Sequence, residues 1–133
     1  MSALGQALAK AGIVEKEKAA NIDKERDEAL KKHKQASDQI WLMTRERRYL
    51  NKMRGGIAKM VRNKDFNSIH NATLYNDICR FIGIPAINLE AKANRNFALN
   101  LIQEQLTMVD KVVRPLISSN KKLEREWGFK RDL

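Results

Sequence analysis

The chain has 133 residues and a net charge of +10, and Asp, Glu, Lys and Arg make up 32% of it. A chain of this length is typically one domain, here with room for an extended appendage. The excess of basic residues favours polyanionic partners and argues against an acidic protein that mimics DNA. No apolar run approaches the roughly 18–20 residues that cross a bilayer, so we expect no membrane partner.

The cysteine and histidine content is low. A single cysteine, Cys79, excludes an intrachain disulfide and is typical of a reducing compartment. With only His33 and His70 beside it, the spacing of metal ligands is absent, so we expect neither a metal site nor a cofactor. The first residues lack the charged and apolar regions of a secretion signal, and we expect a cytoplasmic protein.

Residue usage favours helices throughout the chain. Proline occurs only at Pro85 and Pro115, and alternation of β-branched residues is nearly missing. Both features predict an all-α fold. We expect a short helix over residues 3–11, ended by Gly12, and a long helix from Glu15 onward. A row of apolar residues at strict intervals of seven follows this long helix, as in a coiled coil. The row holds Ile22, Ala29, Ala36, Met43, Leu50 and Ile57.

The positions that accompany this row divide the chain into two parts. The residue three positions after each of the first four members of the row is polar, and only after Leu50 and Ile57 is it apolar (Met53 and Met60). We therefore expect residues 1–37 to form the short helix and a projecting, solvated helical arm, which pairs with a second copy in a homodimer. Residues 38–133 would form a compact helical domain that begins with a basic helix over residues 38–64.

Two adjacent glycines, Gly55 and Gly56, interrupt the basic helix. Each costs roughly 1 kcal/mol in a helix interior, so the pair predicts a break or a kink. Two alternatives remain: the glycines allow close packing of two helices, or Gly55 lets a phosphate approach the backbone.

After residue 63 the sequence predicts shorter elements. Residues 63–73 are rich in Asn, Asp and Ser and indicate a loop, with Thr73 as the N-cap of a helix that Gly83 ends. Pro85 is expected at the first position of the next helix, which Pro115 kinks or ends. The inner face of that helix would carry Leu89, Ala93, Phe97, Leu101, Met108, Val109 and Val112.

Residues 74–100 resemble the helix-turn-helix pattern. Cys79 is a small residue at the fifth place from Tyr75, Gly83 takes the ninth, and the fourth, eighth, tenth and fifteenth are apolar. The pattern departs at the eighteenth place, where Lys92 replaces an apolar residue. The resemblance implies that Asn88, Lys92 and Arg95 form an outward face of the second helix. Side chains of these types can bind base edges. The alternative is a solvated face on an ordinary pair of packed helices.

The strongest signal lies between residues 45 and 64, which hold eight basic residues and only one acidic residue, Glu46. Placed at 100° per residue, five of the basic residues lie within about a third of the helix circumference. Met43, Leu50, Met53, Ile57 and Met60 gather on roughly the opposite side. A helix that buries one apolar side and exposes basic residues on the other is suited to binding a phosphate backbone. The five basic residues are Arg45, Arg48, Lys52, Lys59 and Arg62.

Each of the two tryptophans admits two interpretations. Trp41 projects to about the same side of the helix as the five cations, where it can stack on an exposed base, or it is buried at a tertiary or dimer contact. Trp127 lies in a basic, aromatic tail that contacts phosphate, docks a partner protein or folds back over the core.

Motifs for catalysis are absent: the chain has neither a GxxxxGK phosphate loop nor a GxSxG elbow. We therefore expect a non-enzymatic protein that binds DNA or RNA, in the manner of a small regulator of transcription, replication or RNA handling. The alternative is a helical adaptor or inhibitor that binds another protein through the long helix and the Trp127 tail.

Overall fold

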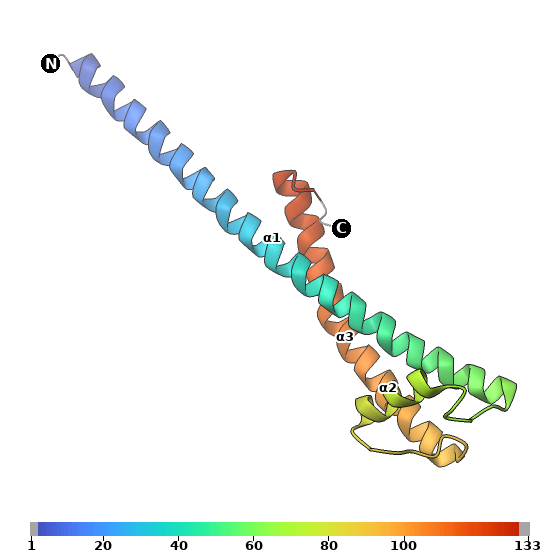
Figure 1. The fold of residues 1–133 in the computed structure, drawn as a ribbon. Helices are drawn as coiled ribbons and strands as arrows, with labels where there is room; N and C mark the ends of the chain where they lie inside the picture. Colours follow the sequence, from blue (N-terminus) through green and yellow to red (C-terminus); the bar gives the residue numbers. More distant parts are fainter. Residues whose placement is uncertain (1–2, 131–133) are drawn as a thin grey trace. The chain divides into compact units, whose positions relative to one another are not determined.

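A computed structural model describes the backbone of residues 3–130 and the side chains of residues 18–130 (Figure 1). The described residues form three helices, α1 (Ala3–Asn63), α2 (Ala72–Ile82) and α3 (Lys92–Trp127), and contain no strand. The expected all-α fold, with a long first helix and a helical C-terminal part, is confirmed.

The first helix is longer than expected. α1 runs without interruption through Gly12 and through Gly55-Gly56 (Figure 1). The predictions of a helix end at Gly12 and of a break at Gly55-Gly56 are therefore wrong. A glycine costs only about 1 kcal/mol in a helix, which good helix formers on both sides outweigh. At Gly56 a contact explains the glycine, since a Cβ added there would overlap the side chain of Leu74 in α2.

The chain forms two compact units. Unit 1 comprises Met1–Gln39 and Ile117–Leu133, and unit 2 comprises Ile40–Leu116. The sequence-based division, between residues 37 and 38, assigned the C-terminal tail to the second part. In the structure the tail belongs to the same unit as the N-terminal part of α1.

Unit 2 is built around one apolar core, to which all three helices contribute. Polar contacts at its edge show that α1 and α3 run antiparallel in this unit: Gln105 donates a hydrogen bond to Glu46 (3.0 Å), and Arg54 donates one to Gln103 (3.1 Å). The buried apolar side chains are Leu50, Met53, Ile57 and Met60 of α1, Ile78 and Cys79 of α2, Ile87 and Leu89 of the connection, and Ala98, Ile102, Leu106, Val109 and Val113 of α3.

The core-facing side of α3 differs from the predicted one. Phe97, Met108 and Val112 are 50, 60 and 40% exposed. The residues that follow Phe97 and Val112 are buried instead, which shifts the inner face by one position, or 100°. In addition, α3 does not end at Pro115 but continues to Trp127.

The segment between α2 and α3 also departs from prediction. α2 ends as expected at Gly83, whose φ of 79° is the left-handed conformation that glycine adopts without strain. Its N-cap is Asn71 rather than Thr73. Residues 83–91 then form an irregular connection, so Pro85 does not begin a helix. A hydrogen bond from the Ile87 amide to the Tyr75 hydroxyl (3.0 Å) holds this connection against α2.

Unit 1 packs α1 against the end of α3 around Ala29, His33 and Ser37. His33 is buried, with Nε2 3.2 Å from Oε1 of Glu124 and its ring 5.5 Å from that of Phe129. Asn120 is also buried and donates to the carbonyl of His33 (3.2 Å) and to Oγ of Ser37 (3.0 Å). The predicted arm is therefore covered along one side by its own chain, at Ala29 and His33, and exposed elsewhere over residues 18–35.

The two glycines of α1 provide a matched test of the contact with α2. Replacing Gly55 by Ala should stabilise the protein by about 0.5–1 kcal/mol, because nothing lies within 4 Å of the added Cβ. Gly56→Ala should fall short of this gain by about 1 kcal/mol, because Leu74 has to move. Urea unfolding followed by circular dichroism measures both. Equal gains would contradict the close packing of α1 on α2.

The two histidines provide a second matched test. His33→Ala should destabilise the protein by about 1–3 kcal/mol, because it opens a cavity and leaves the largely buried Glu124 without its partner. His70→Ala should change the free energy of unfolding by less than about 0.5 kcal/mol, because His70 is exposed. Urea unfolding monitored by tryptophan fluorescence compares them. A similar effect of the two changes would argue against the described packing of unit 1.

Candidate nucleic-acid interface

The part of α1 in unit 2 presents a row of solvated cations. Burial of Leu50, Met53 and Ile57 against the rest of unit 2 determines how this stretch of α1 is rotated about its axis. The opposite side therefore faces water. We call this side the cationic face; it comprises Arg45, Arg48, Lys52, Lys59 and Arg62, all of which are exposed as the sequence predicts.

The basic residues of α1 that border α3 are bonded within the chain. Arg47 forms an ion pair with Asp110 (3.2 Å), and Arg54 donates to Gln103 and Asn51. By contrast, among the residues whose side chains the structure describes, no carboxylate lies within 4.0 Å of a cation of the cationic face. The positive charge of this face is thus left for an external partner or for counterions.

Trp41 lies at one end of the cationic face. Its side chain is 59% exposed, and the guanidinium of Arg45 lies 5.6 Å from the centre of its ring. The expectation that Trp41 is buried at a tertiary contact is therefore wrong for the chain on its own. One turn of helix separates the two residues, which is the spacing at which helical side chains meet.

α2 contributes a cation that sequence reasoning missed. The Tyr49 hydroxyl donates to the Asp77 carbonyl (3.3 Å), which places α2 beside the edge of the cationic face. Burial and the nearby Asp77 carboxylate raise the pKa of Tyr49, and the charge of Arg80 opposes this shift. Arg80 follows Asp77 by three residues, so the two lie on the same side of α2, and exposed Arg80 adds a cation beside the cationic face. The Tyr75-to-Gly83 pattern offered no signal that Arg80 adjoins α1.

The predicted base-reading face is not formed. Asn88 lies in the irregular connection, where its side chain accepts a hydrogen bond from the Glu90 amide (3.1 Å). Lys92 is exposed at the first position of α3, and the guanidinium of half-buried Arg95 lies 5.0 Å from the centre of the Phe66 ring. The connection over residues 83–91 is also longer than the roughly 3–4-residue turn of a helix-turn-helix unit.

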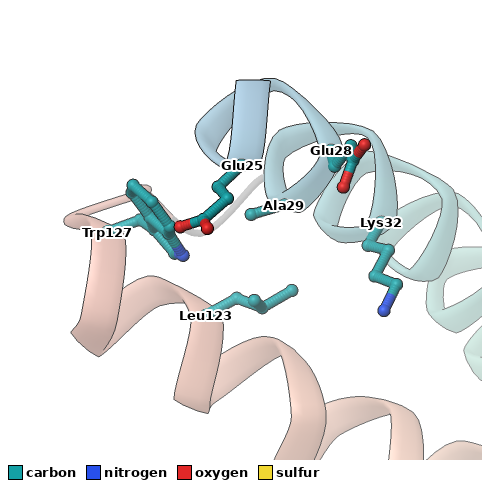
Figure 2. A pocket seen from close by; sticks show the side chains of 6 residues that line it. All are labelled: Glu25, Glu28, Ala29, Lys32, Leu123 and Trp127. Carbon is teal, nitrogen blue, oxygen red and sulfur yellow. The ribbon is translucent and has the colours of Figure 1, made fainter. Parts of the chain in front are cut away.

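Trp127 is partly enclosed within unit 1. Its ring stacks on that of Phe129, with 6.4 Å between the centroids. The indole also lines a shallow hollow of about 180 Å³ between α1 and α3, where Leu123 and Ala29 form the apolar base (Figure 2). Glu25 extends toward the indole, and Glu28 and Lys32 lie along the same helix (Figure 2). The hollow is small and open, and it lacks a cluster of groups suited to catalysis.

Two further features are absent from the described residues. No three His, Cys, Asp or Glu side chains among them are grouped so as to hold a metal ion. No helix in this part of the chain is both long enough and apolar enough to cross a membrane.

Comparison with known proteins gives no functional lead. No protein-family model matches the chain, no curated protein is significantly similar to it, and no solved structure is significantly similar to it.

Arg95 and Lys92 test whether the start of α3 has a structural or a recognition role. Arg95→Ala should destabilise the protein by about 0.5–1 kcal/mol, because it removes the cation–π contact with Phe66. Lys92→Ala should leave the free energy of unfolding unchanged, because Lys92 is exposed. Thermal and urea unfolding measure both variants. Unchanged stability of Arg95→Ala, with loss of sequence-selective duplex binding in both variants, would instead support base reading.

Proposed function

We propose that this protein binds nucleic acid without chemistry of its own and uses the cationic face of α1 for phosphate contacts. The observation that carries the proposal is a difference in partners between two groups of basic residues in the unit 2 part of α1. All of these basic residues are exposed, but Arg47 is paired with Asp110 and Arg54 donates to Gln103, whereas the five of the cationic face have no described carboxylate within ion-pair distance. A merely solvated helix face usually mixes charges of both signs.

The dimensions of the face suit a phosphate backbone. From Arg45 to Arg62 the helix rises by roughly 26 Å, comparable to about seven or eight nucleotides of one B-form strand. Each phosphate neutralised by a basic side chain releases condensed counterions, and this release is the main source of affinity in such contacts. The overall charge of +10 adds long-range attraction for the same polymers.

The role that follows is recognition of a DNA or RNA backbone, as in a small regulator of transcription, replication or RNA handling. Base reading by Asn88, Lys92 and Arg95 is not part of the proposal, because these side chains do not share a helix face. A homodimer formed through α1 stays a prediction from the heptad row.

A protein partner is the second candidate. It is favoured by the exposed apolar side chains of α3, Phe97, Met108 and Val112, which lie on one side of that helix. The Trp127 tail supports it less, because Trp127 is half-buried against its own unit. Removing the tail would also be a poor test, since Glu124 and Phe129 cover His33.

Reversing charge on the cationic face tests the proposal. We expect the triple variant Arg48→Glu, Lys52→Glu, Lys59→Glu to weaken binding to nucleic acid more than tenfold while leaving unfolding unchanged, because all three positions are exposed. Fluorescence anisotropy with labelled duplex DNA, single-stranded DNA and RNA at several salt concentrations measures the affinity. For the wild-type protein, five phosphate contacts on a duplex predict a log–log salt slope of about −4.5.

A matched control separates the face from net charge. The variant Lys111→Glu, Arg114→Glu, Lys121→Glu reverses three exposed cations that lie on α3 rather than on α1. It changes the net charge by the same amount as the triple variant of the cationic face. It should lose much less affinity than the triple variant of the cationic face. Equal losses would show that only net charge matters, and no saturable binding by the wild-type protein would reject nucleic acid in favour of a protein partner.

A further inference from the structure

We propose that Trp41 and Arg45 form a stacking platform for an unpaired base, so that the cationic face selects single-stranded nucleic acid over duplex. This inference rests on the proposed function and names the class of polymer. The chemistry recognised is a base free of its Watson–Crick partner, joined to a phosphodiester backbone, in DNA or in RNA.

The exposure of Trp41 is the first argument. A tryptophan that is 59% exposed leaves a large apolar and aromatic surface in water, and its described contact is with the Arg45 guanidinium, 5.6 Å from the ring centre. The other tryptophan, Trp127, is half-buried and stacked on Phe129. Unit 2 thus leaves the ring of Trp41 outside its core, where a flat π surface is available to a ligand.

The position of Trp41 is the second argument. Trp41, Arg45, Arg48 and Lys52 follow one another at intervals of four, three and four residues, which is the spacing of neighbours along one helix face. The ring therefore stands at the end of a row of phosphate-binding side chains. A strand whose phosphates follow this row brings a base to the level of the ring within about 17 Å of helix.

Duplex and single-stranded nucleic acid differ in how accessible their base faces are for stacking on the Trp41 ring. In a duplex the faces of the bases are covered by their neighbours, and inserting a side chain requires a base step to be unstacked. A single strand presents base faces without that cost, and aromatic stacking there tolerates any base. The Arg45 guanidinium lies over one face of the ring, so a base would stack on the other face while Arg45 supplies a cation for the adjoining phosphate. Phosphate contacts alone would not discriminate in this way.

The test compares three variants of the full chain on three probes. The probes are labelled dT20, labelled rU20 and a labelled 20-base-pair duplex, and binding is followed by anisotropy. Trp41→Ala should weaken binding to both single strands by about 5- to 150-fold, the range expected for one base–aromatic stack, and change duplex binding less than twofold. Trp41→Phe should recover most of the loss, because phenylalanine also stacks.

Leu42→Ala is the matched control. Leu42 is as exposed as Trp41, at 59%, but projects about 100° away around the helix. The Leu42→Ala variant should bind all three probes with the affinity of the wild-type protein. If Leu42→Ala weakens single-strand binding as much as Trp41→Ala does, the loss comes from removing any exposed apolar side chain or from a change in self-association. The platform is then rejected.

Fluorescence provides a readout of stacking itself. The chain has two tryptophans, so Trp41→Phe retains only Trp127. Binding of unlabelled dT20 should quench the emission of the wild-type protein and of Leu42→Ala but not that of Trp41→Phe, although Trp41→Phe still binds. Quenching that persists in Trp41→Phe would overturn the proposal.

The outcomes also separate this inference from the proposed function. If the wild-type protein binds duplex and single strands equally and Trp41→Ala changes neither, the platform is wrong while the cationic face stands. If the wild-type protein binds no probe, both are wrong.

Discussion

The burial of one stripe of α1 against α2 and α3 is the constraint on which the rest of unit 2 depends. Leu50, Met53 and Ile57 are almost completely removed from water, and together they determine the rotation of this stretch of helix about its axis. Because side chains on a helix have fixed angular positions, burial of one stripe commits the opposite one to solvent. The cationic face is thus a direct consequence of the core and needs no contact of its own to be displayed.

The sequence was sufficient to predict both sides of this stretch of α1, because apolar and basic residues separate cleanly around the helix. It was not sufficient for α3, where Phe97 and Ala98 begin two adjacent rows that are both apolar. Which row is buried depends on where α1 and α2 lie, and that is a property of the tertiary structure. Gly56 illustrates the same limit: its cost to helix propensity can be read locally, whereas its contact with Leu74 cannot.

The connection after α2 shows how local patterns are overridden. The Gly-Ile-Pro sequence at residues 83–85 favours a tight turn, yet side chains hold the backbone in a longer path. Tyr75 accepts from the Ile87 amide, and Asn94 donates to the Asn88 carbonyl (3.0 Å). Such bonds join residues 6 to 12 positions apart, outside the window of any helix or turn rule. The candidate residues Asn88 and Arg95 thereby became part of the scaffold.

The angular position of a basic residue around α1 determines whether it has a partner within unit 2. A basic residue of α1 at the border with α3 meets Asp110 or Gln103, while those a third of a turn further round are exposed and have no carboxylate within 4.0 Å among the described side chains. Exposed ion pairs contribute little to stability, so nothing in the fold requires five cations where no acid faces them. Self-repulsion among them opposes folding rather than favouring it. The cationic face lies beside the exposed indole of Trp41, and the contacts that stabilise unit 2 do not account for it; this is the physical basis of the proposed role in binding.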